Sequence, residues 1–290
     1  MARQRRRVGS KRSRGLAVPA ALLACAVPGA ATAQAPAAVS AAPAPTYADL
    51  VSLAEASAVV AEVTVKGQAI VPPERAPGLA PGRARLYLET QTQRVLKGPS
   101  ALGESVSYLT DVALDAKGKP PKLKKQAFLV FANSVAGRLG ELQLVAPDAQ
   151  LPLDPATEAR VRTVIGQLSE PRVAPRITGV RDVISVAGNL SGESETQMFV
   201  NTRSGAPVSL TVIRRPNMEP TWGVSWSEIV DQAAMPPERD TLAWYRLACF
   251  LPRQLSGDAF LQSDIAGRRR AEADYRFILD QLGTCERTRH

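Results

Sequence analysis

The sequence predicts an α+β protein in which a five-stranded β-barrel with helices is followed by a small antiparallel sheet plus C-terminal helices. Three observations lead to this prediction. The stretch from Arg83 to Gly98 alternates between apolar and polar residues, as a strand with one buried face does. Shorter runs with the same period flank it between residues 59 and 145. Helical patterns with clear start and stop signals return after residue 236.

The first 33 residues have the three-part plan of a secretory signal peptide. Seven arginines and lysines precede an apolar run from Gly15 to Val27, and a small-residue site follows, so we expect cleavage after Ala33. The apolar run is too short for a retained membrane-spanning helix, and no later segment reaches that length. The mature protein is therefore expected in the periplasm or outside the cell.

A second interpretation of the leader involves Cys25. The residues Leu22 to Cys25 resemble the lipobox of bacterial lipoproteins, in which the cysteine is acylated and becomes the mature N-terminus. Leucine at the second position is atypical there, so cleavage after Ala33 is preferred. The alternative is an outer-membrane lipoprotein anchored through Cys25.

The formal net charge of +9 does not indicate a nucleic-acid partner. Seven basic residues lie in the leader, and the rest of the chain carries 29 basic residues against 27 acidic ones. A nucleic-acid-binding domain would keep its basic excess after export.

The barrel is expected within residues 46–170, after a Pro/Ala-rich linker at residues 34–45. Thr46 and Asp49 form a capping box that starts a short helix. The predicted strands are residues 59–66, 83–98, 104–112, 126–132 and 142–145, and Asp154 caps a helix after them. Five strands with an amphipathic helix suit a small closed barrel of the OB type.

Part of this region resembles a known family. A helix ending in A-D-L-V-S-L-A-E-A-S, a strand with A-V-V-A-E-V-T-V and a strand ending in R-V-L-K-G are similar to exported bacterial domains related to the netrin-like and tissue-inhibitor-of-metalloproteinase OB-folds. The resemblance covers about residues 47–147 and implies a barrel that binds other molecules. The inhibitory chemistry of that family requires an N-terminal cysteine presented to a metal. This barrel contains no cysteine, so that chemistry is not expected.

Residues 176–290 are expected to form an α+β domain after a proline-rich boundary at Pro171 to Pro175. Residues 177–187 fit either a helix or a strand, and the strand is preferred. A hairpin is predicted at residues 196–202 and 207–214, with a short strand at residues 222–226. Helices are predicted after a capping box of Ser225 and Glu228, at residues 238–251 after a double proline, and before a stop at Gly283.

Cys249 and Cys285 are predicted to form a disulfide. Export places the mature chain in an oxidising compartment, and cleavage after Ala33 removes Cys25. Two cysteines then remain, and they allow only one intramolecular pairing.

The shortage of histidine excludes several kinds of catalysis. The only histidine is His290, the last residue, and chain ends are usually mobile. Ser-His-Asp and Cys-His catalysis and most zinc sites need a held imidazole. The sequence also has no P-loop or dinucleotide fingerprint, so we predict no cofactor and no metal.

A hydrolase that uses two carboxylates needs no histidine, and Glu193 and Glu195 are the best candidate pair. Two acids beside a glycine turn are more often solvated loop residues, which is the preferred interpretation. Trp222 and Trp226 fit an exposed recognition site or a half-buried core, and the core is preferred.

Two further groups are candidates for binding. Tyr87, Gln91 and Gln93 are expected on the outward face of the second strand, where OB-folds bind ligands. Five lysines between residues 117 and 125 fit contact with an anionic lipid or cell-wall polymer, or a solvated loop that protects the next apolar strand from aggregation. The second interpretation is preferred for the lysines.

Together these features favour an exported, non-enzymatic binding module of the bacterial periplasm or envelope. Its expected partner is an unidentified protein or envelope polymer. The alternatives are a carboxylate-based hydrolase that acts on envelope polymer and a lipid-anchored structural lipoprotein.

Overall fold

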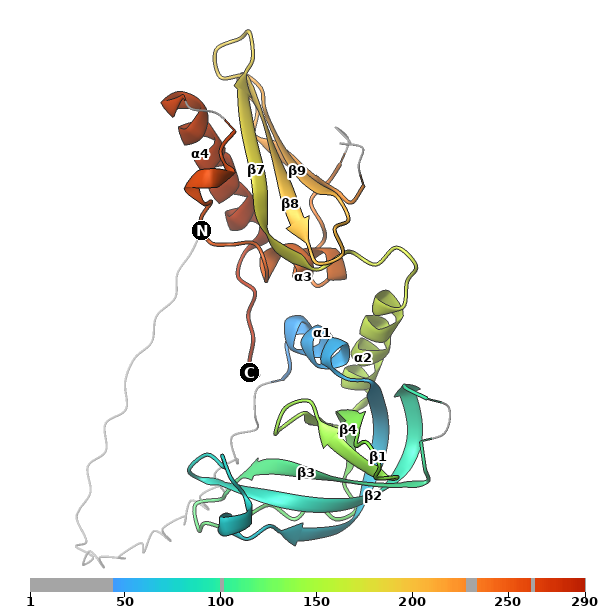
Figure 1. The fold of residues 1–290 in the computed structure, drawn as a ribbon. Coiled ribbons are helices and arrows are strands. Elements are labelled where there is room, and N and C mark those ends of the chain that lie inside the picture. Colours follow the sequence, from blue (N-terminus) through green and yellow to red (C-terminus); the bar gives the residue numbers. More distant parts are fainter. Residues whose placement is uncertain (1–43, 100–101, 228–233, 262–263, 290) are drawn as a thin grey trace, which may run out of the picture. The chain divides into compact units, whose positions relative to one another are not determined.

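The computed structural model describes residues 44–99, 102–227, 234–261 and 264–289. The predicted signal peptide and Cys25 lie outside these residues, as does most of the linker. The described part is an α+β fold with a barrel followed by a separate antiparallel sheet (Figure 1). None of its helices combines the length and the apolar character needed to cross a lipid bilayer.

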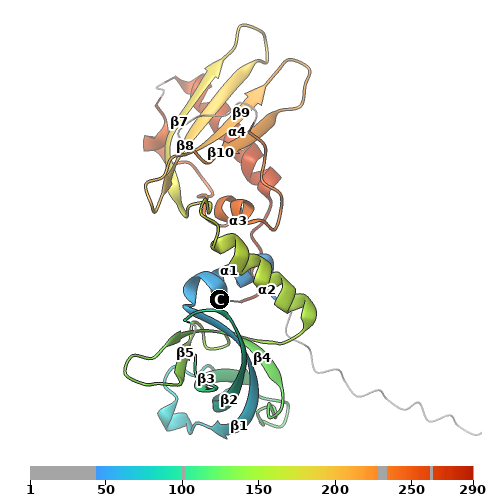
Figure 2. The ribbon, with the colours of Figure 1, turned by 90° about the vertical axis from the view of Figure 1, so that its right-hand side faces the viewer.

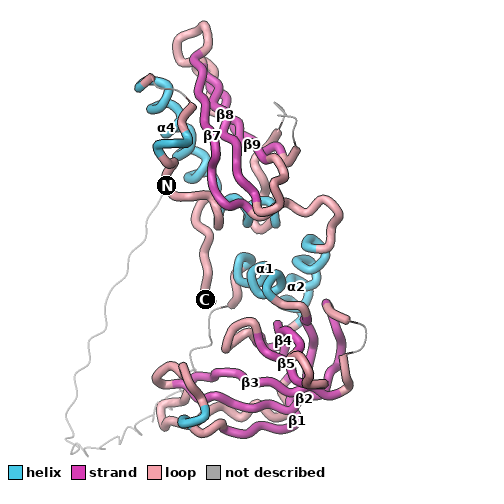
Figure 3. The backbone as a smooth tube through the Cα atoms, in the orientation of Figure 1, coloured by secondary structure: helices cyan, strands magenta, loops and turns pink. Residues whose placement is uncertain are grey.

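All five predicted barrel strands are present. They are β1 (Val59–Ile70), β2 (Arg83–Lys97), β3 (Ser105–Ala113), β4 (Ala127–Ser134) and β5 (Glu141–Leu144). Their order is β1-β2-β3-β5-β4, and pairing of β1 with β4 closes the barrel (Figures 2 and 3). The β3–β5 pair is parallel and the others are antiparallel. A short strand that the sequence did not indicate, β6 (Gln150–Pro152), pairs with β4.

The outer face of β1 differs from the expected pattern. Strict alternation with Val59 and Ala61 facing inward would place Val60 and Glu62 on the outward face, but both are buried. Glu62 is covered by helix α2 (Pro155–Leu168), which begins at the predicted Asp154 cap and contacts the barrel through ion pairs. The carboxylate of Glu62 lies 3.5 Å from the guanidinium of Arg162 on this helix, and 3.2 Å from that of Arg94 on β2.

Helix α1 (Tyr47–Ala56) begins as predicted, with the Thr46–Asp49 capping box. The C-terminal end of α1 contacts Lys97, the lysine of the R-V-L-K-G motif. The Lys97 Nζ donates to the carbonyl oxygens of Ala54 at 2.6 Å and Ser57 at 2.7 Å. These carbonyls belong to the last turn of the helix and to its C-cap, where acceptors otherwise lack partners. Lys97 therefore ties the end of β2 to α1.

Replacing Lys97 with methionine is expected to lower the free energy of unfolding by about 1 to 2 kcal/mol, because two half-buried carbonyls lose a charged donor. Lys66 on β1 is exposed and supplies the control, and Lys66→Met is expected to change stability by less than about 0.5 kcal/mol. Urea denaturation of the two variants measures the difference. Equal stability of the two would show that Lys97 does not support the helix end.

The second sheet has the order β10-β9-β8-β7. Its strands are β7 (Ile177–Ala187), β8 (Ser194–Thr202), β9 (Val208–Arg214) and β10 (Thr221–Ser225), which confirms the predicted hairpin and the strand interpretation of residues 177–187. Helix α4 (Ile265–Leu282) packs on this sheet and ends at Gly283 as predicted (Figure 1). Its fully buried Asp274 accepts a hydrogen bond from Arg214 Nε at 2.6 Å.

The helix predicted at residues 238–251 is shorter than expected. Helix α3 (Leu242–Ala248) begins where the Thr241 side chain accepts the backbone N–H of Trp244 at 3.2 Å. Asp240, just before this cap, has a φ of 58°, which a helix does not accommodate. The double proline therefore does not start the helix. Of the helix start predicted at Ser225 and Glu228, Ser225 is the last residue of β10, and Glu228 with the residues up to 233 lies outside the described part. Two 3-10 turns, η1 (Pro73–Arg75) and η2 (Gly257–Ala259), complete the elements.

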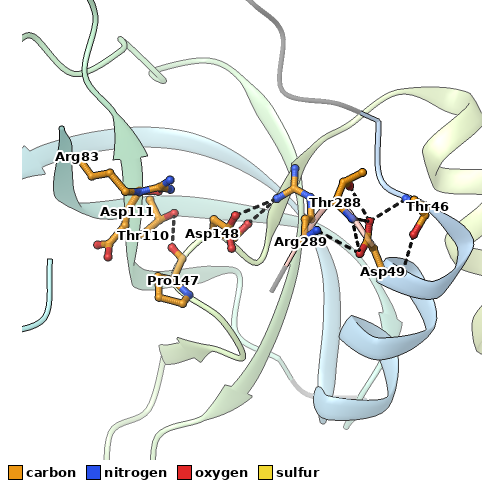
Figure 4. A network of polar contacts seen from close by, with 9 residues as sticks. All are labelled: Thr46, Asp49, Arg83, Thr110, Asp111, Pro147, Asp148, Thr288 and Arg289. Atoms are coloured by element: carbon orange, nitrogen blue, oxygen red, sulfur yellow. Dashed lines mark hydrogen bonds and ion pairs between the residues drawn. The ribbon is translucent and has the colours of Figure 1, made fainter. Parts of the chain in front are cut away.

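Cys249 and Cys285 form the predicted disulfide, with an S–S distance of 2.01 Å. The chain that follows Cys285 is held against α1 (Figure 4). Thr288 donates to the Asp49 carboxylate through its backbone N–H and through its hydroxyl, the latter at 2.7 Å. Arg289 donates its N–H to the same carboxylate and its guanidinium to the Asp148 carbonyl oxygen at 3.1 Å. The disulfide thus precedes a tail that is hydrogen-bonded to Asp49 on α1 and to Asp148.

Glu55, near the end of α1, forms a second long-range connection. Its carboxylate accepts hydrogen bonds from Arg176, at 2.7 Å, and from Arg246 on α3. Arg246 is almost fully buried and also donates to the Ala174 carbonyl oxygen at 3.0 Å. Burial raises the pKa of Glu55, but the hydrogen bonds from the two arginines outweigh it, so the pKa lies below its ordinary value.

Candidate binding groove on the barrel

The barrel has a groove of about 900 Å³ on its outer surface. The end of β1, the outward faces of β2 and β3, and β5 with the loop before it line this groove, which we call the barrel groove. A volume of this size suits a ligand of several residues or sugar units rather than a single ion.

The floor of the barrel groove is apolar. The strand register places Tyr87 on β2 opposite Leu109 on β3 and opposite Ala69 on β1. The exposed fractions are 38% for Tyr87, 47% for Leu109 and 59% for Ile70. The next residues along the strands, such as Leu86 and Leu88, point inward and are fully buried. A cluster of exposed apolar side chains in a concavity is a common feature of interaction sites.

One end of the floor is an ion pair. The Asp111 carboxylate accepts two hydrogen bonds from Arg85, from Nε at 2.7 Å and from Nη2 at 2.9 Å. The hydrogen bonds from Arg85 to Asp111 raise the pKa of Arg85 above its ordinary value. Arg85 also donates to the Pro77 carbonyl oxygen at 3.1 Å, which holds the β1–β2 loop beside the groove. Arg85 and Asp111 therefore use their charged groups on each other and form one side of the groove.

The rim carries two further arginines. Arg138 pairs with Glu141 at 3.1 Å, and both side chains are exposed. Arg75 is exposed and has no acidic partner among the residues that the structure describes. The rim therefore has one uncommitted positive charge next to an apolar floor.

Of the three binding residues predicted on β2, only one lies in the barrel groove. Tyr87 lines the barrel groove, whereas Gln91 and Gln93 are exposed further along β2 and do not line it. Sequence reasoning missed Leu109 and Ile70. The sequence did contain one signal for this site. Leu109 lies between Tyr108 and Thr110, which face inward, so alternation places this apolar residue on the outer surface.

Glu193 and Glu195 lie far along the chain from the groove and line no part of it. Glu193 precedes β8, and its Oε2 accepts the backbone N–H of Leu190 at 3.2 Å. Glu195 is on β8, and its Oε1 accepts a hydrogen bond from Gln197 at 2.8 Å. Neither forms an ion pair within the described ranges. Their observed contacts stabilise a turn and a strand.

A smaller cavity of about 380 Å³ lies beside β10, between Trp222, Met235 and Phe277. Trp222 is only 5% exposed, and Trp226 is partly buried, so the preferred core interpretation of these tryptophans is confirmed. In the described part of the chain no group of three or more His, Cys, Asp or Glu residues is placed to hold a metal ion.

The fold and the groove define an α+β protein with a closed five-stranded barrel that carries an apolar surface groove. In comparisons with known proteins, no family model and no curated protein matched the chain.

Proposed function

We propose that this protein is an exported, non-enzymatic binding module that holds a partner in the barrel groove. The observation that carries the proposal is the exposed cross-strand pair of Tyr87 and Leu109, which lines a concavity together with the exposed Ile70. Exposed apolar area of this kind is costly in water and becomes favourable when a partner covers it.

The chemistry of the floor favours a protein partner over a sugar polymer. Tyr87 is the only exposed aromatic residue of the groove, and its neighbours are aliphatic. The nearest strong polar groups, Arg85 and Asp111, already satisfy each other. Sugars need several free donors and acceptors, whereas a polypeptide segment with apolar side chains needs mainly a floor of this kind. Arg75 would pair with an acidic residue of the partner.

The predicted leader and the Cys249–Cys285 disulfide support a location in the periplasm or outside the cell. Disulfides form and persist in oxidising compartments and are rare in reducing ones. The lipoprotein alternative depends on Cys25, which lies outside the described residues. Incorporation of labelled palmitate at Cys25 would favour that alternative.

A photo-crosslinking amino acid placed at position 87 or 109 is expected to capture a discrete partner in the intact cell envelope. The same amino acid at position 93 is the matched control, because Gln93 is exposed on the same strand but outside the groove. Denaturing electrophoresis and mass spectrometry of the products provide the measurement. Equal capture at all three positions would mean that the groove is not a specific site.

A substitution in the groove tests whether the captured partner contacts the apolar floor. Leu109→Asp places a charge beside Tyr87 without touching the barrel interior, since Leu109 faces outward. We expect it to abolish capture from position 87, while Gln93→Asp leaves capture intact. Persistent capture in the Leu109→Asp variant would contradict an apolar contact.

The hydrolase alternative has no specific observation in its favour. Glu193 and Glu195 each accept a local hydrogen bond, and the groove does not include them. Turnover of envelope polymer that is lost in a Glu193→Gln, Glu195→Gln double variant would support the enzyme and argue against the binding module.

A further inference from the structure

The loop between β3 and β4 concentrates the lysines of this protein. Five of its eight lysines lie between residues 117 and 125, while the chain uses arginine 28 times elsewhere. We call residues 115–125 the lysine loop. All five lysines are exposed. None of their side chains has an ion-pair or hydrogen-bond partner within the described part of the protein.

The backbone of the lysine loop is held in place. Asp115 Oδ1 accepts the N–H groups of Lys117 and Lys119, both at 2.8 Å. The Gln68 side chain on β1 accepts the N–H of Leu123 at 2.7 Å and donates to the Pro121 carbonyl oxygen at 3.1 Å. Leu123 itself is 6% exposed and packs into the barrel core. The lysines are therefore presented from a fixed backbone with a buried anchor.

The loop also differs in charge from the rest of the protein. It carries five lysines and one acid, Asp115, whereas the remainder of residues 34–290 has 24 basic and 26 acidic residues. A local net charge of this size, beside a nearly neutral body, attracts an anionic surface to one end of the barrel.

Protection of a strand edge does not account for this charge. Pairing of β1 with β4 stops at Thr64, and an uncovered edge of β1 after this residue could pair with another chain. The loop backbone already covers that edge, because the N–H of Lys125 donates to the Val65 carbonyl oxygen at 2.8 Å. The five ammonium groups are not needed for edge protection.

We propose that the lysine loop docks the protein onto an anionic lipid bilayer. Clusters of four to eight basic residues bind anionic headgroups through summed charge, without a shaped pocket. The loop offers no aromatic residue for stacking on bases or sugars. Lysine is a hydrated point charge that suits a diffuse headgroup layer, whereas arginine suits paired recognition of single phosphates.

Docking and partner capture are separate properties, because the lysines do not line the barrel groove. Each can fail without the other.

The test is sedimentation of the purified protein with vesicles of about 30% phosphatidylglycerol and 70% phosphatidylethanolamine, or of neutral phosphatidylcholine, at low salt. Replacing all five lysines with glutamine is expected to weaken partitioning onto the anionic vesicles at least about a hundredfold, because each lysine near the surface contributes about a fivefold factor. Binding to the neutral vesicles should be negligible for both proteins.

The matched control removes the same charge elsewhere. Arg172, Arg203, Arg215, Arg253 and Arg269 are exposed and form no ion pair among the described residues, and replacing these five with glutamine leaves the lysine loop intact. We expect this variant to bind like the parent within about threefold. Equal weakening in both variants, or retention of binding after the lysine replacement, would overturn the proposal. Binding to a soluble polyanion such as polyphosphate without binding to anionic vesicles would also overturn it.

Discussion

Replacing Cys249 and Cys285 with serine is expected to lower the free energy of unfolding by about 3 to 4 kcal/mol. The disulfide closes a loop with a sequence separation of 36, and in the chain-entropy model a crosslink of that span restricts the unfolded chain by this amount. The change is a large part of the net stability of an ordinary domain. Urea denaturation followed by tryptophan fluorescence gives the measurement.

Removing the disulfide should also release the C-terminal tail. Thr288 and Arg289 contact Asp49 only a few residues after Cys285, so hydrogen exchange at their amides should accelerate when the crosslink is absent. Reduced parent protein is the control, because it has the same chain without the crosslink. A reduced parent that keeps the full stability of the oxidised protein would show that the disulfide is not what holds the tail.

Replacing Glu55 with glutamine is expected to lower the free energy of unfolding by about 3 kcal/mol. The substitution leaves the guanidinium of Arg246, 4% exposed, without a negative partner, and an uncompensated buried charge is costly. Glu141→Gln is the matched control, since Glu141 pairs with Arg138 at the surface and is expected to contribute less than about 0.5 kcal/mol. A loss for Glu55→Gln no larger than that of the control would mean that Arg246 gains little from the pair.

The same variant tests the pH dependence. The pKa of Glu55 in the folded protein lies below its ordinary value of 4.5, so its ionised form favours folding. This stabilisation is present above the unfolded value and is lost as the pH falls through the folded pKa. From about pH 5 to pH 3 the parent protein should therefore lose more stability than Glu55→Gln. Parallel stability curves for the two proteins would contradict the lowered pKa.

Asp49 should contribute to the acid sensitivity that the Glu55→Gln variant retains. Burial raises its pKa, but hydrogen bonds from Thr288 and Thr46 outweigh that effect, so the pKa is lowered. Protonation of this carboxylate at acid pH would weaken the contact between the tail and α1.

Much of the fold followed from local patterns. Alternation with a period of two predicted the barrel strands and the hairpin, and it favoured a strand for residues 177–187. Thr46 and Asp154 marked helix starts because a side-chain oxygen at that position satisfies backbone N–H groups a few residues away. The start of α3 was wrong because Thr241 caps the helix and Asp240 takes a left-handed conformation, which no proline pattern indicates.

The candidate site was only partly predictable. Tyr87 was predicted for its outward position on a long strand, and it lies in the groove. Gln91 and Gln93 are exposed on the same strand but lie outside the groove, because the extent of the groove depends on where β1 ends and how the loop before β5 folds. A strand pattern gives the face of a residue, not the shape of the surface around it.

The sequence by itself determined the five barrel strands, the strands of the second sheet and the pairing of Cys249 with Cys285, because these depend on local periodicity and on counting. The tertiary structure alone decided that Glu55 meets Arg246, 191 residues away, and that Lys97 ends helix α1. It also decided that Ile70 and Leu109 stay exposed beside Tyr87. These contacts arise from strand register and chain packing over long distances, which no short window of residues contains.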